Sequence, residues 1–209
     1  MSEETLVVGL TGGICSGKGV ISQRLAEFGA EIINADLIGH QIYLPGTDAW
    51  KEIIAAWGED ILLPDQTVNR AKLGGIVFGD PKELEKLNAI THPRMYKRIE
   101  DDIQAIKARE NRPPMIVVEA AILIEANWIP LVDRVWVVVT DYELAMRRLM
   151  DRNKLTYQQA TARISAQMTN AERYKYAHVI LNNNGTIDEL KWHIDRAWYK
   201  ALKIKDPVW

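Results

Sequence analysis

Five short runs of the chain are mainly apolar and rich in β-branched residues, at residues 5–10 (extending to Thr11), 31–34, 115–120, 134–140 and 178–183. Such runs suit strands that are buried on both faces of a parallel sheet. Helical periodicity fills the intervals between most of them, as right-handed crossovers between parallel strands require. The pattern predicts an α/β fold in three layers, with a parallel five-stranded sheet.

The interval between the second and third runs is about 80 residues long and contains no good strand pattern. Ordinary crossovers are much shorter. Helical patterns lie at 48–58, 70–79, 81–91 and 94–110, and Pro113 with Pro114 ends the last of them. We therefore expect a helical domain at 45–112, inserted into a core formed by 1–44, 113–140 and 176–209.

Three further helical patterns follow the fourth strand. The first two, at 141–153 and 156–177, are rich in arginine, and the third occupies 187–202. Thr156 with Gln159, and Thr186 with Glu189, have the spacing of a capping box, in which the two side chains satisfy backbone amides at a helix start.

The first strand leads into the stretch "GLTGGICSGKGV", which matches the phosphate-binding loop G-x-x-x-x-G-K-[ST] except at the last position, Gly19. Successive backbone amides of such a loop, or P-loop, bind phosphates, and Lys18 adds a positive charge. The residues expected to bind nucleotide are Gly12, Gly13, Ile14, Cys15, Ser16, Gly17, Lys18, Gly19 and Val20. A glycine-rich turn with an exposed lysine is the alternative, and P-loops also serve GTPases, ATPases and nucleotide sensors.

Composition limits the partners. The chain of 209 residues carries a net charge of -2, so nothing attracts it as a whole to nucleic acid or to an anionic membrane. No apolar stretch reaches the ~18 residues of a membrane helix, and the start "MSEETLVVGL" lacks the pattern of a signal peptide. One cysteine and four scattered histidines give no zinc-site spacing. We expect a cytoplasmic protein, a monomer or weak homo-oligomer, that acts on a small molecule.

Five segments together resemble dephospho-CoA kinases: "GLTGGICSGKG", "IINADLIGHQIYLPG", "VNRAKLGGIVFGDPKELEKLNAITHP", "EAAILIE" and "RISAQMTNAERYKYAHVILNNNG". They follow one another in that family's order over nearly the whole chain. The resemblance implies a P-loop kinase that uses ATP and Mg²⁺ to phosphorylate the ribose 3'-hydroxyl of dephospho-CoA, the last step of coenzyme A synthesis. It also implies that 45–112 is the substrate domain and that 141–175 is a helical lid.

Four positions depart from the family's pattern: Gly19 replaces a magnesium-binding Ser, Asn34 an Asp, Ala121 a Pro and His178 an Asp. Only Gly19 touches the chemistry directly. Magnesium often keeps several waters, so a water could take the place of the missing hydroxyl. An active kinase with weakened magnesium binding is the resulting hypothesis.

Two acidic residues have candidate roles. Asp36 follows the second strand and matches the family's catalytic Asp, which orients the acceptor hydroxyl; the alternative is an N-cap for the helix beginning there. Glu119 ends the third strand, where P-loop proteins often hold magnesium through water. A solvated strand end is its alternative. Glu125 also matches the family, without a defined role.

Arg148 and Arg152 lie four residues apart on one helix face and belong to the lid that the resemblance implies. Guanidinium groups there would neutralise charge on the transferring phosphoryl group. A solvated helix face is the alternative.

The resemblance also assigns binding residues. His40, Arg70, His92 and Pro93 match positions of the substrate domain, although helix capping and a proline-set helix start remain open for His92 and Pro93. Asn183 and Gly185 resemble the loop that borders the ATP base, with a simple turn as the alternative. Cys15 lies where a thiolate would be favoured, or where a small residue simply fits.

Two other functions compete with this one. A kinase of another small acceptor, such as a nucleoside monophosphate, would keep the P-loop and the lid. A non-catalytic ATP sensor is the second rival, and Gly19 is its main support.

Overall fold

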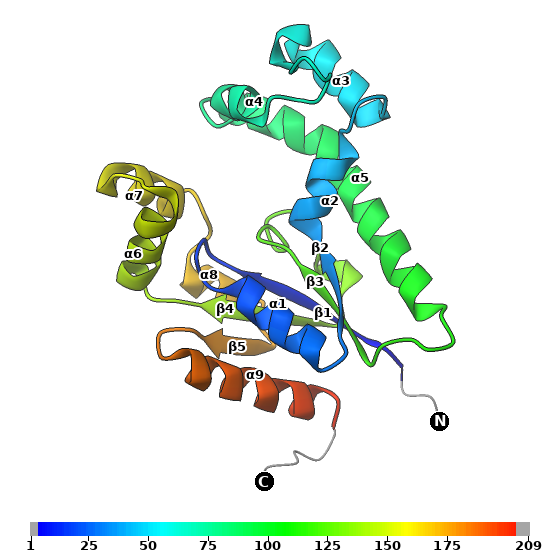
Figure 1. The fold of residues 1–209 in the computed structure, drawn as a ribbon, viewed down its shortest axis with the longest axis vertical. Coiled ribbons are helices and arrows are strands. Elements are labelled where there is room, and N and C mark those ends of the chain that lie inside the picture. Colours follow the sequence, from blue (N-terminus) through cyan, green and yellow to red (C-terminus); the bar gives the residue numbers. More distant parts are fainter. Residues whose placement is uncertain (1–3, 204–209) are drawn as a thin grey trace. The chain divides into compact units, whose positions relative to one another are not determined.

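The computed structural model describes residues 4–203 of the chain. Its centre is a five-stranded sheet in the order β2-β3-β1-β4-β5 (Figure 1). The strands are β1 (Leu6–Gly12), β2 (Glu31–Asn34), β3 (Met115–Glu119), β4 (Arg134–Val139) and β5 (Val179–Asn182). β1 pairs in parallel with β3 and β4, and β4 pairs in parallel with β5. The prediction of an α/β fold with a parallel five-stranded sheet is confirmed.

The chain divides into two compact units. One contains the described residues up to Ile33 and from Ile103 onward, including the sheet, and the other is Asn34–Asp102. The turn signals of the sequence had suggested boundaries at 44/45 and 112/113 instead. Packing places one boundary at the last residue of β2, between Ile33 and Asn34, and the other within a long helix.

The sheet unit is held together by strands whose two faces are both covered. Val7 and Val8 of β1, on opposite faces, are 1% and 0% exposed. Helices α1 (Lys18–Glu27) and α9 (Ile187–Ala201) bury Leu25 and Ile194 in the same apolar cluster as Leu10. Arg24 of α1 also donates two hydrogen bonds to Asp195 of α9, at 2.9 and 2.8 Å.

The helical unit has its own core. It contains α2 (Ala35–Ile42), α3 (Asp48–Trp57), the short 3-10 helix η1 (Glu59–Ile61), α4 (Arg70–Val77) and most of α5 (Pro81–Lys107). Thr47 and Asn69 cap α3 and α4 by accepting hydrogen bonds from Trp50 and Lys72 amides. The buried residues of this core are Ile53, Ile61, Val68, Leu73 and Val77.

α5 corrects one prediction, because residues 81–107 form one helix and not two. Pro93 lies inside it, so the proposal that this proline starts a helix is wrong. Its ring nitrogen cannot donate to the carbonyl one turn earlier. A buried stripe at helical spacing, containing Met95, Ile99, Ile103 and Ile106, continues through the rest of the helix. Burial of that stripe outweighs the one missing hydrogen bond.

The segment after β4 contains α6 (Tyr142–Asn153), α7 (Tyr157–Ser165) and α8 (Asn170–Tyr174). The single helical pattern expected at 156–177 is divided, because Thr169 and Glu172 form a capping box that starts α8. The two capping boxes predicted at Thr156 and Thr186 are confirmed. A second 3-10 helix, η2 (Ile129–Leu131), precedes β4. Within 4–203, no helix is long and apolar enough to cross a bilayer.

Candidate active site

The P-loop runs from the end of β1 at Gly12 to the start of α1 at Lys18. Gly17 has a φ of 98° and caps α1 with no side-chain hydrogen bond. A Cβ there would overlap the Asn183 amide, and one on Gly12 would lie 2.5 Å from the Val138 carbonyl oxygen. Close approach of neighbouring groups therefore requires both glycines.

Two neighbouring segments, which contain Thr140 and Asn183, both donate hydrogen bonds to one carbonyl group of this loop. The Asn183 Nδ2 donates to the Ser16 carbonyl at 2.7 Å, and the Thr140 hydroxyl donates to the same oxygen at 3.2 Å. Arg148 in turn donates to the Asn183 carbonyl at 3.3 Å. Arg152 is exposed and donates to the Asn153 side chain at 2.9 Å instead. The structure thus brings Asn183 and Arg148 to the loop, and leaves Arg152 at the surface.

The side chains of the loop differ in their surroundings. Lys18 Nζ donates to the Gly12 carbonyl at 2.9 Å, so the ammonium group crosses back to the start of the loop. Cys15 packs with Ile14 against the apolar cluster of Met146 and Leu149 in the segment after β4. Gly19 faces open space, since nothing lies within 4 Å of a Cβ placed there.

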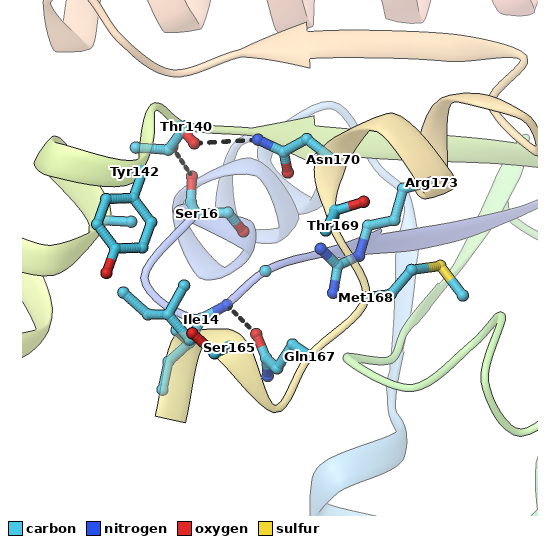
Figure 2. A pocket seen from close by; sticks show the side chains of 13 residues that line it. Ile14, Ser16, Thr140, Tyr142, Ser165, Gln167, Met168, Thr169, Asn170 and Arg173 are labelled. Atoms are coloured by element: carbon cyan, nitrogen blue, oxygen red, sulfur yellow. Dashed lines mark hydrogen bonds between the residues drawn. The ribbon is translucent and has the colours of Figure 1, made fainter. Parts of the chain in front are cut away.

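A pocket of about 410 Å³ lies between the P-loop and the segment from Thr140 to Arg173 (Figure 2). The Ser16 hydroxyl lines it and is buried without a hydrogen-bond partner among residues 4–203. The Ile14 amide donates to the Gln167 side-chain oxygen at 2.7 Å, as the dashed line in Figure 2 shows. A loop amide and a buried hydroxyl in one pocket are suitable donors for phosphate oxygens.

Arg173 of α8 also lines the pocket, and it was not among the residues predicted from the sequence. Its side chain is 3% exposed, and Nη2 lies 3.6 Å from Glu125 Oε1, too far for a hydrogen bond. Burial lowers the pKa of Arg173, while the charges of Glu125 and Glu172 oppose that shift. The only signal in the sequence was its place in a segment that resembles the family, because an arginine on a short helix is usually solvated. The same contact gives Glu125 a structural partner.

Glu119 lies at the end of β3, and its Oε2 accepts a hydrogen bond of 2.7 Å from the buried Ser22 hydroxyl of α1. In the described part of the chain, no three His, Cys, Asp or Glu residues are grouped to hold a metal ion. Magnesium at nucleotide sites usually takes one or two carboxylates and completes its shell with phosphates and water. A single positioned carboxylate such as Glu119 fits that donor set.

Asp36 belongs to the helical unit, in the first turn of α2. The N-cap of α2 is Asn34, whose side chain accepts from the Leu37 amide at 3.0 Å. The alternative role of Asp36 as an N-cap is therefore wrong.

His40 and Arg70 line a hollow of about 440 Å³ within the helical unit, together with Tyr43 and Leu44. Burial, and then the charge of Arg70, lower the pKa of His40, whereas burial raises the pKa of Tyr43. A cation beside neutral polar and apolar groups can bind an anion that carries an apolar arm.

The remaining predicted residues lie elsewhere. His92 and Pro93 are inside α5 and do not line that hollow, and burial lowers the pKa of His92. Gly185 borders a separate depression of about 650 Å³ beside Trp192 of α9, apart from the pocket at the P-loop.

Comparisons with known proteins agree with this arrangement. Residues 6–189 match the family model described as "Dephospho-CoA kinase". The dephospho-CoA kinase of Geobacter sulfurreducens is 42% identical over 196 residues, which cover 94% of this chain and 98% of that protein.

Two solved structures are similar over most of their length. A dephospho-CoA kinase from Campylobacter jejuni is 25% identical, with a TM-score of 0.69, and the match covers 94% of this chain and 97% of that one. The protein TT1252 from Thermus thermophilus reaches a TM-score of 0.77 at 25% identity, over 96% and 98% of the two chains. With its P-loop, its inserted helical unit and a family match that spans both, the chain belongs to the dephospho-CoA kinase family.

Proposed function

We propose that this protein transfers the γ-phosphoryl group of ATP to the ribose 3'-hydroxyl of dephospho-CoA, which gives CoA and ADP. The family match over residues 6–189 is the observation that carries this proposal. Family membership makes the protein a phosphotransferase, and its small-molecule substrate follows from the same membership.

In this proposal, the P-loop amides and Lys18 bind the β- and γ-phosphates of ATP. Arg148, which the Asn183 carbonyl holds beside the loop, neutralises charge as the phosphoryl group moves. Arg152 donates to Asn153 at the surface, so its contribution would require movement of its side chain or of α6. Gly185 borders the adenine base, and Asn183 supports the loop through Ser16.

On the acceptor side, Asp36 orients the 3'-hydroxyl and accepts its proton, since its carboxylate is not engaged as a helix cap. Arg70 and His40 bind the pyrophosphate of dephospho-CoA at the hollow that they line. His92 and Pro93 act in the same domain as substrate-binding positions. The helical unit is then the substrate domain, and 141–175 is the lid.

Glu119 would hold Mg²⁺, with Ser22 fixing its carboxylate. The ion would supply positive charge to the phosphate oxygens. We further propose that the enzyme works in the cytoplasm as a monomer or weak homo-oligomer.

Acceptor-dependent release of ADP tests the proposal. The protein is incubated with ATP and Mg²⁺ plus dephospho-CoA, AMP or no acceptor, and product CoA is identified by mass spectrometry. Stimulation by dephospho-CoA alone is the expected result. Asp36→Asn should lower kcat by roughly 100-fold or more, as loss of an orienting base does, while ATP affinity stays unchanged.

Gly19 favours one rival, a non-catalytic ATP sensor. Tight ATP binding without turnover on any acceptor would establish the sensor and overturn the proposal. Stimulation by AMP alone would instead assign a nucleoside monophosphate kinase.

A further inference from the structure

We propose that Arg173 is a substrate-contacting residue that binds the terminal phosphate of ATP in the pocket between the P-loop and α8. The inference rests on the proposed use of ATP and adds a cation that was not among the residues predicted from the sequence.

The burial of Arg173 is the first reason. The residue is 2% exposed, and its Nε and Nη2 atoms have no hydrogen-bond partner among residues 4–203. An arginine buried in this way is costly unless an anion pairs with it. Glu125 supplies only part of that charge, because its side chain is 32% exposed and 3.6 Å away. The guanidinium therefore has donors available for a further anion.

The position of the guanidinium is the second reason. A Cβ on Gly13 would lie 3.5 Å from Arg173 Nη1 and 3.7 Å from Gln167 Oε1. That Gln167 oxygen already accepts the Ile14 amide at 2.7 Å. Figure 2 shows Gln167 and Arg173 lining the same pocket beside the loop. Arg173 thus lies next to a place where the loop already donates to an oxygen atom.

The position of Lys18 indicates which phosphate is bound. A P-loop lysine reaches the β- and γ-phosphates, and here its Nζ donates to the Gly12 carbonyl. The ammonium group is therefore at the Gly12–Gly13 end of the loop, which Arg173 also approaches. The buried Ser16 hydroxyl faces the same pocket. These donors together suit the γ-phosphate of ATP, which ADP lacks.

The test compares ATP with ADP. Calorimetry measures the binding of each nucleotide to wild-type protein, Arg173→Met and Arg173→Lys, with Arg163→Met, an exposed lid arginine, as the matched control. Arg173→Met should weaken ATP by roughly 10- to 100-fold, the range for a hydrogen bond to a charged group, and ADP by no more than about 3-fold. Arg173→Lys keeps the charge without the planar fork and should fall between wild type and Arg173→Met. The control should change neither affinity.

Equal weakening of ATP and ADP in the Arg173 variants would show a structural role for the pair with Glu125 and would overturn the inference. Thermal unfolding without nucleotide verifies that each variant is folded, and Arg173→Lys gives the answer if the Met variant is not. No acceptor is present, so this result does not depend on which acceptor is phosphorylated. Failure of the inference leaves the ADP-release assay intact, and failure of that assay leaves the ATP and ADP affinities interpretable.

Discussion

Position 19 lacks the side chain that would bind magnesium, whereas the other residues of the site are in place. The P-loop, Lys18 and Glu119 are all in place, and the Ser22 hydroxyl fixes the Glu119 carboxylate at 2.7 Å. Ser22 lies one helical turn after Lys18 in α1. Its hydroxyl therefore reaches Glu119 at the end of β3 and does not replace the hydroxyl missing at position 19. Magnesium binding should therefore be weakened at one ligand only.

Gly19→Ser should lower the magnesium concentration needed for half-maximal ATP binding and turnover by several-fold, because a hydroxyl ligand replaces a water. The serine fits, since nothing lies within 4 Å of the new Cβ. Titration of Mg²⁺ at fixed ATP measures the change. Gly75→Ser, another open glycine on helix α4, controls for the general effect of serine on a helix. An unchanged magnesium requirement in Gly19→Ser would contradict the hypothesis.

His92 gives the protein a pH-dependent stability. Burial lowers its folded-state pKa from the ordinary value of 6.5. Below about pH 6.5 the unfolded chain binds a proton that the folded chain does not, so this contribution is complete above that pH and is lost as the pH falls toward the folded pKa. His92→Gln removes it.

The free energy of unfolding, measured in urea at about pH 7.5 and about pH 5.5, should therefore fall less in His92→Gln than in wild type. Between about pH 7.5 and about pH 8.5 the two proteins should change in parallel, which serves as the control. A steeper fall in the variant would mean that the protonated His92 stabilises the fold.

At the scale of elements, two side chains add hydrogen bonds to the turns of α5 that precede Pro93. The Arg94 guanidinium donates to the Ile90 carbonyl at 2.6 Å, and the Thr91 hydroxyl donates to the Leu87 carbonyl at 2.9 Å. The same arginine also pairs with Glu52 of α3 at 2.6 Å. Neither bond reaches the Ala89 carbonyl, which Pro93 leaves without its helical donor, so burial of the apolar stripe after the proline keeps α5 continuous.

Pro93→Ala should raise the free energy of unfolding by about 1–2 kcal/mol. An interior proline costs about 3 kcal/mol in a helix, and the stiffening of the unfolded chain that is lost on its replacement offsets about 1 kcal/mol. Urea unfolding measures the change. Pro81→Ala at the first position of the same helix is the matched control and should change stability by less than about 0.5 kcal/mol, because proline is tolerated there. A less stable Pro93→Ala would show that the proline sets a conformation on which the packing depends.

The capping box at Thr169 has a consequence for the site. It ends the preceding irregular stretch and starts α8 at Asn170, so Gln167 lies in the connection and Arg173 on the helix. A continuous helix would have fixed the positions of Gln167 and Arg173 relative to each other. The break allows each side chain to approach the P-loop from its own direction.

For the whole molecule, the sequence predicted the sheet because its central strands β1, β3 and β4 are covered on both faces and so appear as long apolar runs. Met115 to Val118 are all 0% exposed, for example. The boundaries of the two compact units were harder to predict from the sequence. Pro45 and Gly46 mark a turn, but a turn does not end a unit when the helix before it, α2, belongs to the same compact unit as the helices after it.

The residues of the candidate site also differ in how well the sequence predicts them. The P-loop could be identified because its backbone needs glycines at fixed spacing, and those needs are visible in the residue types. Arg173 could not, because its burial depends on contacts with Glu125 and the P-loop, which are far away in the sequence. Asn34 illustrates a local alternative resolved only by geometry, since either Asn34 or Asp36 could have capped α2.

In the proposed function, Gln167 and a phosphate oxygen of ATP would compete for the same Ile14 amide. The glutamine is tethered to the loop that it occupies, so it acts as a competitor of high effective concentration that dilution cannot remove. An affinity measured for ATP is then already reduced by the fraction of molecules in which the amide is engaged. In the proposed function, a phosphate oxygen that accepts from the Ile14 amide would release Gln167, and with it the connection between α7 and α8 that leads to Arg173.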